Sequence, residues 1–184
     1  TGDFVVTWRL NGENDDGMVR RRGDEFEAIL LDDSVSSSRS EIPWSFAAHS
    51  SDLYFVLMGE TLLRSTDSGA TWESLGEDID VRRLFHTTSG VVATTTNGLW
   101  SLPETGRPTH IAFADQELRA LAEAPDGRLV VSLWPEGIQI GSGDQWSPLE
   151  GWPPYMLDLL FAEDGTLFGA AYGLGVVVAA AETD

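Results

Sequence analysis

The sequence repeats a unit of about 38 residues, and this period constrains the fold more than any other feature. Residues 81–90, 118–127 and 156–165 align with one another, and each segment ends in Ser-Gly or Asp-Gly. Asp52 takes the same place in an earlier copy, so that the marker positions 52, 90, 127 and 165 are spaced by 38, 37 and 38 residues. A fixed period of this length indicates that one supersecondary unit recurs along the chain.

Each copy contains up to four short runs of β-branched and aromatic residues. The runs are separated by Gly, Asp, Asn and Pro, which are typical of tight turns between antiparallel strands. No segment sustains the 3.6-residue periodicity of a helix. A period near 38 with about four strands per unit is typical of β-propeller blades. The pattern therefore predicts an all-β fold, a β-propeller of about five four-stranded antiparallel blade units.

The unit boundaries leave both terminal units incomplete. We place the units at about residues 1–33, 42–80, 81–117, 118–155 and 156–184, within a single domain that spans residues 1–184. The first unit lacks its opening strand, and the last unit lacks its closing strand. Because closed propellers remove free strand edges, these units predict either an imperfect closure or completion from elsewhere. A second copy could complete them, so self-association through the open terminal blades is one expectation, and a fragment of a longer receptor is another.

One hairpin of the second unit carries a complete motif. Residues 65–72 read Ser-Thr-Asp-Ser-Gly-Ala-Thr-Trp, a full Ser-x-Asp-x-Gly-x-Thr-Trp. This segment resembles the Asp box of the BNR repeat, which occurs in sialidases, sortilin-like receptors and photosystem assembly propellers. The resemblance implies a structural role for Ser65, Asp67, Gly69, Thr71 and Trp72. An Asp side chain can close such a turn, Gly supplies a positive φ, and the Trp ring packs between sheets.

Weaker forms of the same pattern stand elsewhere. Degenerate boxes occupy the matching place at residues 141–146 and 22–26, whereas residues 101–109 have lost both the Asp and the Trp. The Asp-Gly-x-Leu of residues 126–129 and the Gly-Leu-Trp of residues 98–100 resemble the propeller repeats of two-component sensor proteins. Together these resemblances extend over most of the chain at the level of the repeat.

The charge balance excludes several classes of function. The chain has 30 acidic residues against 11 arginines and no lysine, a formal net charge of -19, and it has no cysteine. Such a polyanion repels phosphate backbones, so we expect no nucleic-acid partner. Without cysteine there is no disulfide and no thiolate metal site. The longest apolar run, Val176 to Ala181, is far shorter than the roughly 20 residues of a membrane span, and residues 1–30 lack a signal-peptide pattern.

The resemblance to sialidases raises an enzymatic hypothesis. That family holds a substrate carboxylate with three arginines and uses a tyrosine nucleophile. Here Arg82, Arg83 and Arg119 lie on the first runs of two units, and Tyr155 directly precedes the first run of the last unit. The family's Arg-Ile-Pro-type motif is absent, and five units are fewer than the six blades of sialidases. No Gly-x-Ser-x-Gly elbow accompanies the three histidines. We assign no catalytic residue, and a glycoside hydrolase or lyase on this scaffold is the alternative.

Three short motifs have structural interpretations that we favour. Asp67 alone supplies too few oxygens for calcium, and Asn14-Asp15-Asp16 is better read as a solvated acidic loop. Arg22-Gly23-Asp24 spells an integrin-binding triplet, but Asp24 stands where the degenerate box needs its turn residue. We therefore expect neither a metal nor a cofactor.

Large aromatic residues mark the most promising binding positions. Trp8, Trp134 and Tyr172 end the second run of their units, next to loops on the face where propellers usually bind ligands. Packing between blades is the competing interpretation of these rings. With two residues from turn contexts and two arginines, the ligand-binding candidates are Trp8, Trp134, Tyr172, Trp152, Tyr155, Arg82 and Arg119. The sequence thus favours a non-catalytic interaction or sensor module for a protein or glycan, located extracellularly or in the periplasm.

Overall fold

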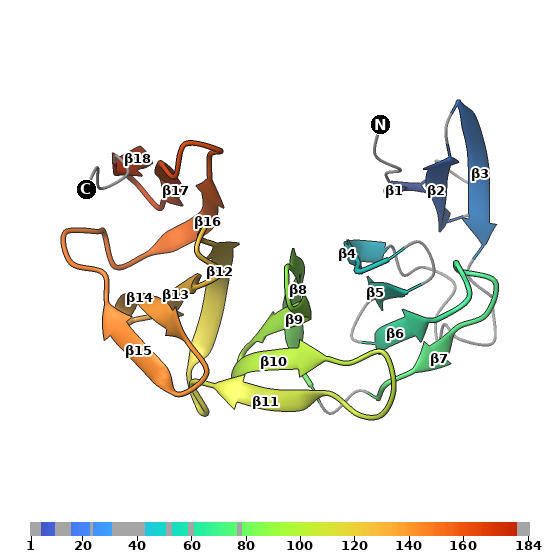
Figure 1. The fold of residues 1–184 in the computed structure, drawn as a ribbon, viewed down its shortest axis with the longest axis horizontal. Coiled ribbons are helices and arrows are strands. Elements are labelled where there is room, and N and C mark those ends of the chain that lie inside the picture. The colour runs from blue at the N-terminus through green and yellow to red at the C-terminus, as the bar shows by residue number, and fades with distance from the viewer. Residues whose placement is uncertain are drawn as a thin grey trace. The chain divides into compact units, whose positions relative to one another are not determined.

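The computed structural model describes residues 5–9, 16–22, 24–30, 43–50, 53–58, 61–76 and 79–179, and the regular elements of these residues are all β-strands (Figure 1). They form five antiparallel sheets, and within each sheet the strands follow one another in chain order. The chain divides into two compact units, one of residues 1–79 with 104–107 and the other of residues 80–103 with 108–184. Among the described residues no helix of the length and apolarity of a membrane span occurs.

The first compact unit contains two sheets. One sheet has three strands, β1 (Val5–Arg9), β2 (Asp16–Arg22) and β3 (Glu25–Leu30). The other has four strands, β4 (Pro43–Ala48), β5 (Tyr54–Met58), β6 (Thr61–Ser65) and β7 (Glu73–Ser74). In the part of the chain that the structure describes, the first sheet has three strands, in agreement with the prediction that the first blade unit is incomplete.

The second compact unit contains three sheets. The first is β8 (Val81–Thr87), β9 (Gly90–Thr95), β10 (Gly98–Leu102) and β11 (Thr109–Ala112). The second is β12 (Glu117–Glu123), β13 (Leu129–Trp134), β14 (Gly137–Ser142) and β15 (Gln145–Pro148). Among the described residues the third has β16 (Met156–Phe161), β17 (Leu167–Ala171) and β18 (Gly175–Ala179), as predicted for an incomplete last unit. That all five sheets form a single domain stays a prediction.

Apolar side chains join neighbouring sheets of the second unit face to face. Between β8–β11 and β12–β15 lie six buried residues, Val92, Leu99, Leu118, Leu121, Val131 and Leu133. Between β12–β15 and β16–β18 lie eight, Ala120, Ala122, Val130, Ile138, Met156, Leu159, Leu167 and Ala171. Because successive residues of a strand face opposite sides, β12 and β13 supply both clusters. This is the stacking of sheets that propeller blades use.

The first strand of four sheets carries an extra residue at the same repeat position. Register shifts separate Val81 from Arg83, Leu118 from Ala120 and Met156 from Asp158, and a fourth separates Pro43 from Ser45. The residues inside these bulges are Trp44, Arg82, Arg119 and Leu157. A bulge re-aims its side chain away from the regular alternation. Two predicted binding arginines are therefore presented by a repeated irregularity of the backbone.

Candidate functional site

Three of the predicted aromatic residues lie together in the second unit. Trp134 ends β13, Tyr155 precedes β16 and Tyr172 follows β17. The rings of Trp134 and Tyr155 meet edge to face with centroids 4.5 Å apart, and those of Tyr155 and Tyr172 do so at 5.5 Å. The Tyr172 amide donates a hydrogen bond to the Tyr155 carbonyl oxygen at 3.2 Å. Tyr155 is therefore the centre of an aromatic cluster supplied by two neighbouring sheets.

Two of the predicted arginines, Arg82 on β8 and Arg119 on β12, lie next to this aromatic cluster. The Arg119 guanidinium lies over the Tyr155 ring, with Cζ 5.8 Å from the ring centroid. Arg119 Nη2 lies 2.8 Å from Glu117 Oε1, and Arg82 Nε lies 3.9 Å from the same oxygen. Arg82 also lies 3.8 Å from Asp80. We call the set Arg82, Arg119, Trp134, Tyr155 and Tyr172 the aromatic–arginine surface.

Much of this surface is open to solvent. Tyr172 is 72% exposed and Trp134 is 46% exposed, although both are large aromatic residues. The ion pairs of Arg82 and Arg119 are also partly exposed, and such pairs contribute only roughly 0–1 kcal/mol to stability. Exposed apolar groups that gather in one place mark interaction sites more often than scattered ones do. Stability alone does not account for these side chains.

Two buried polar atoms at the centre of the surface lack a hydrogen-bond partner among the described residues. They are Glu117 Oε1 and Arg119 Nε. The short contact between these two side chains therefore joins opposite charges without the geometry of a good hydrogen bond. The attraction between the two charged side chains offsets part of the cost of burying these atoms.

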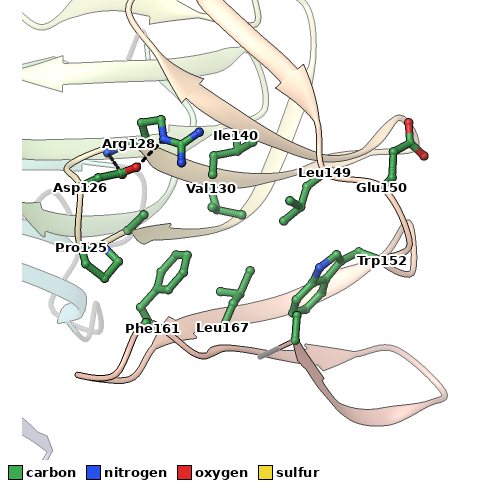
Figure 2. Close-up of a pocket in the computed structure, with 13 residues that line it drawn as sticks. Pro125, Asp126, Arg128, Val130, Ile140, Leu149, Glu150, Trp152, Phe161 and Leu167 are labelled. Atoms are coloured by element: carbon green, nitrogen blue, oxygen red, sulfur yellow. Dashed lines mark hydrogen bonds and ion pairs between the residues drawn. The ribbon is translucent and has the colours of Figure 1, made fainter. Parts of the chain in front are cut away.

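The other two aromatic candidates do not join the surface. Trp152 is partly buried and packs against the cluster between β12–β15 and β16–β18. A Cβ atom added to Gly169 would lie 2.9 Å from the Trp152 ring, so the glycine makes room for it. Trp152 also lines a pocket in which Figure 2 shows it beside Leu167. The side chain of Trp8 lies outside the described residues, so its role stays a prediction.

The hairpin at residues 65–72 is closed by its own side chains. Asp67 Oδ1 accepts hydrogen bonds from the Thr71 amide and from Ser65 Oγ, both at 2.8 Å, and Asp67 Oδ2 accepts one from Thr71 Oγ1 at 2.5 Å. These bonds favour the carboxylate and lower the Asp67 pKa to about 2, the Thr71 side chain contributing most. Ser65 Oγ in turn accepts the Gly69 amide at 2.8 Å, and Gly69 has a φ of 87°.

The tryptophan of this hairpin has a counterpart in another sheet. Trp72 Nε1 donates to the Gly69 carbonyl at 3.1 Å, and Trp146 Nε1 donates to the Gly143 carbonyl at 2.8 Å, in both cases three residues back. Trp146 was predicted to stand in a degenerate copy of the same motif. The shared bond indicates that the two turns orient their indole rings in the same way.

Two further acidic residues also act within turns. The Arg128 amide donates to Asp126 at 3.0 Å and the Thr166 amide donates to Asp164 at 2.9 Å. These bonds lower the pKa of both carboxyl groups. Part of the acidic excess therefore serves the turns of the repeat.

In the part of the chain that the structure describes, His, Asp and Glu side chains form no group of three suited to a metal ion.

Sequence reasoning missed the two acidic residues that pair with these arginines: Glu117 contacts both Arg82 and Arg119, and Asp80 contacts Arg82. Asp80 and Glu117 each stand two residues before an arginine of the surface, in Asp80-Val81-Arg82 and Glu117-Leu118-Arg119. The acid-x-Arg pattern thus recurs after 37 residues. This recurring pattern is the sequence signal that predicts an acidic partner for each arginine.

Comparisons with known proteins show the fold and no closer relationship. No protein-family model matches the chain, and a search of curated proteins also finds no match. YCF48 bound to D1 peptide is similar at a TM-score of 0.63 and 16% identity, over 90% of this chain and 58% of that one. Virginiamycin B lyase from Staphylococcus aureus is similar at a TM-score of 0.65 and 11% identity, over 98% of this chain and 67% of that one.

A third similar structure belongs to a sensor. The extracellular domain of the putative hybrid two component system BT4673 from B. thetaiotaomicron has a TM-score of 0.70 and 14% identity, over 93% of this chain and 25% of that one. The chain therefore spans only 58% and 25% of the YCF48 and BT4673 chains. All three are β-propeller proteins, and with the four-stranded antiparallel sheets they confirm that this chain has the β-propeller fold.

Proposed function

We propose that this chain is a non-catalytic interaction module that binds a protein partner through the aromatic–arginine surface. The observation that carries the proposal is the unbroken line of contacts from Arg82 through Glu117 and Arg119 to the three rings. Trp, Tyr and Arg are the residue types that most often dominate the energy of protein interfaces. One structural neighbour was solved with a bound peptide, YCF48 with D1 peptide, which supports the same class of partner here.

The geometry of the rings favours a protein over a glycan. The planes of Trp134 and Tyr155 stand at 78°, and those of Tyr155 and Tyr172 at 90°. These rings form ridges rather than one flat platform. A sugar ring stacks on a flat aromatic face, whereas protein side chains fit between ridges and make edge contacts of the same kind. A glycan is therefore the second class of partner to test.

The test is a selection followed by matched variants. A random peptide-display library and a glycan array are screened with the full chain, and the affinity of each binder is then measured. We expect Tyr172→Ala and Arg82→Ala to weaken selected peptides about tenfold or more, as hot-spot residues do. Val178→Ala is the matched control, because Val178 is another exposed large residue that lies on β18. Selected peptides whose affinity is the same for Tyr172→Ala, Arg82→Ala and the unmodified chain would refute the proposal.

The alternative is a glycoside hydrolase or lyase built on the same surface. Glu117 is the carboxylate that an enzyme would use there, since it lies between two arginines and has an oxygen without a hydrogen-bond partner in the described part of the chain. A panel of glycosides and uronides distinguishes the two functions. Turnover that is lost in Glu117→Gln would establish the enzyme, whereas binding without turnover supports the interaction module.

Three finer assignments accompany this proposal. We assign residues 65–72 to the Asp box of the BNR repeat, with a structural role, on the support of its hydrogen bonds and of the matching Trp146 turn. An extracellular or periplasmic location is supported by the extracellular domain among the structural neighbours. Self-association through the terminal blades stays a prediction, which analytical ultracentrifugation tests directly.

A further inference from the structure

The last sheet has a strand edge without a partner among the described residues. Among the strands that the structure describes, β18 pairs with β17 alone, whereas β14 in the preceding sheet pairs with both β13 and β15. An unpaired edge presents a row of backbone donors and acceptors that can accept another strand. Extended peptides bind to such edges in the mode called β-augmentation.

The register of the preceding sheet shows what a fourth strand does in this fold. Gly141 of β14 lies opposite Leu129 on one side and opposite Trp146 of β15 on the other. The Trp146 ring meets the Phe113 ring edge to face at 4.6 Å and packs against the apolar cluster shared with the sheet before it. The fourth strand therefore supplies an aromatic side chain that fills the outer space between two sheets.

Ala179 takes the place of Gly141 in the last sheet. It lies opposite Leu167, which is 38 residues after Leu129, just as Ala179 is 38 residues after Gly141. Among the described residues no strand lies on the other side of Ala179, and no side chain corresponds to Trp146. In the described residues, the interface between β12–β15 and β16–β18 therefore has no counterpart of the Trp146 ring, which fills the equivalent interface before it.

A pocket of about 660 Å³ lies at this interface, and Ala179 is part of its wall. Figure 2 shows Val130, Ile140 and Leu149 on one side of it and Phe161, Leu167 and Trp152 on the other. The Asp126–Arg128 ion pair and Glu150 are the charged groups along its edge. The lining thus combines apolar and aromatic side chains with polar groups in similar measure, and suits an aromatic side chain that carries a polar group, such as Trp or Tyr.

We propose that a partner peptide pairs in extended form with β18 and inserts an aromatic side chain opposite Ala179 into this pocket. The occupant is a neutral or basic segment, because the chain carries a net charge of -19 and a second copy would bring the same charge against it. This site is separate from the aromatic–arginine surface.

The probe for this proposal is taken from the chain's own fourth strand. The probe peptide has the sequence of residues 145–149, Gln-Trp-Ser-Pro-Leu, with a lysine added at each end. The control peptide is identical except that Ala replaces Trp. Binding to the full chain is followed by NMR titration of the β18 amides and by their hydrogen exchange. We expect saturable shifts and slower exchange at β18 with the Trp peptide, and about tenfold or greater weakening with the Ala peptide.

Protein variants locate the bound peptide. Ala179→Trp fills the pocket from within and should weaken the Trp peptide about tenfold or more, whereas Val178→Trp, on the opposite face of β18, should leave it unchanged. Leu149→Arg is the second pocket variant should Ala179→Trp fail to fold, as judged by thermal unfolding. Tyr172→Ala should not affect this peptide, which separates the pocket from the proposed function above.

Two results would overturn the proposal. Equal affinity of the Trp and Ala peptides, or an unchanged affinity in both pocket variants, would show that the pocket does not receive the aromatic side chain. A dimer in ultracentrifugation that Ala179→Trp dissociates, together with no peptide binding, would assign the edge to a second copy.

Discussion

Tyr155 should stabilise the candidate site more than either ring beside it. The Tyr155→Ala variant loses two edge-to-face ring contacts and the contact with the Arg119 guanidinium. Each ring pair is worth about 0.5–1.5 kcal/mol beyond burial, and an exposed cation–π contact about 0.5–1 kcal/mol. The three contacts give an expected loss of roughly 2–3 kcal/mol in the free energy of unfolding. Tyr172→Ala loses one ring contact from a side chain that is largely exposed, so we expect roughly 1 kcal/mol or less.

Urea denaturation followed by circular dichroism measures both variants under the same conditions, and the slope with urea checks that the unfolding transition is unchanged. A double-mutant cycle between Trp134 and Tyr155 isolates the ring pair and should give a coupling of about 0.5–1.5 kcal/mol. The reasoning fails if Tyr155→Ala costs no more than Tyr172→Ala, or if the coupling is zero. Either outcome would mean that the rings lie near one another without interacting.

Three further predictions address the scaffold. Hydrogen bonds in the folded state lower the pKa of Asp67 from 3.8 to about 2, so the ionised side chain stabilises the fold above pH 3.8, and this stabilisation is lost as the pH falls from 3.8 to about 2. The melting temperature between pH 2 and 5 should therefore depend less on pH in Asp67→Asn than in the unmodified chain. Gly141→Ala should destabilise the chain by about 1–3 kcal/mol more than Gly169→Ala, since the new Cβ overlaps the Gln145 backbone oxygen at Gly141, whereas at Gly169 it overlaps the flexible end of Met156 and lies close to the Trp152 ring. Equal urea midpoints of the two variants would contradict this. Leu118→Ala, at a fully buried position, should cost about 2–5 kcal/mol, whereas Leu160→Ala, which is 65% exposed, should stay within about 0.5 kcal/mol in the same assay.

The repeat made the strands predictable because turn chemistry and strand composition are local properties. The marker residues Gly90, Gly127 and Gly165 lie at the turn between the first and second strands of their sheets. The same local reasoning found Trp134, Tyr155 and Tyr172, since each stands at a strand end or in a turn. Local reasoning could not predict the contacts among these three rings, because the contacts depend on how neighbouring sheets stack.

Three features could not be predicted from one sequence. Regular alternation places Val81 and Arg83 on one face, and only pairing with β9 reveals the bulge at Arg82. Trp152 and Tyr155 share one loop, yet Trp152 faces the apolar cluster, because loop geometry and not strand alternation sets its direction. The repeat indicated that the last unit lacks its closing strand. The pocket beside Ala179 was not predictable from this, because its lining depends on how two neighbouring sheets stack.

The footprint of a selected peptide on the protein tests the account most directly. Hydrogen exchange and NMR shifts of the full chain are measured with and without a peptide obtained from the display library. We predict that the largest changes fall at residues 80–83, 117–119, 134–136, 155 and 172–174, around the aromatic–arginine surface. A saturable footprint that leaves these segments unchanged would contradict the account.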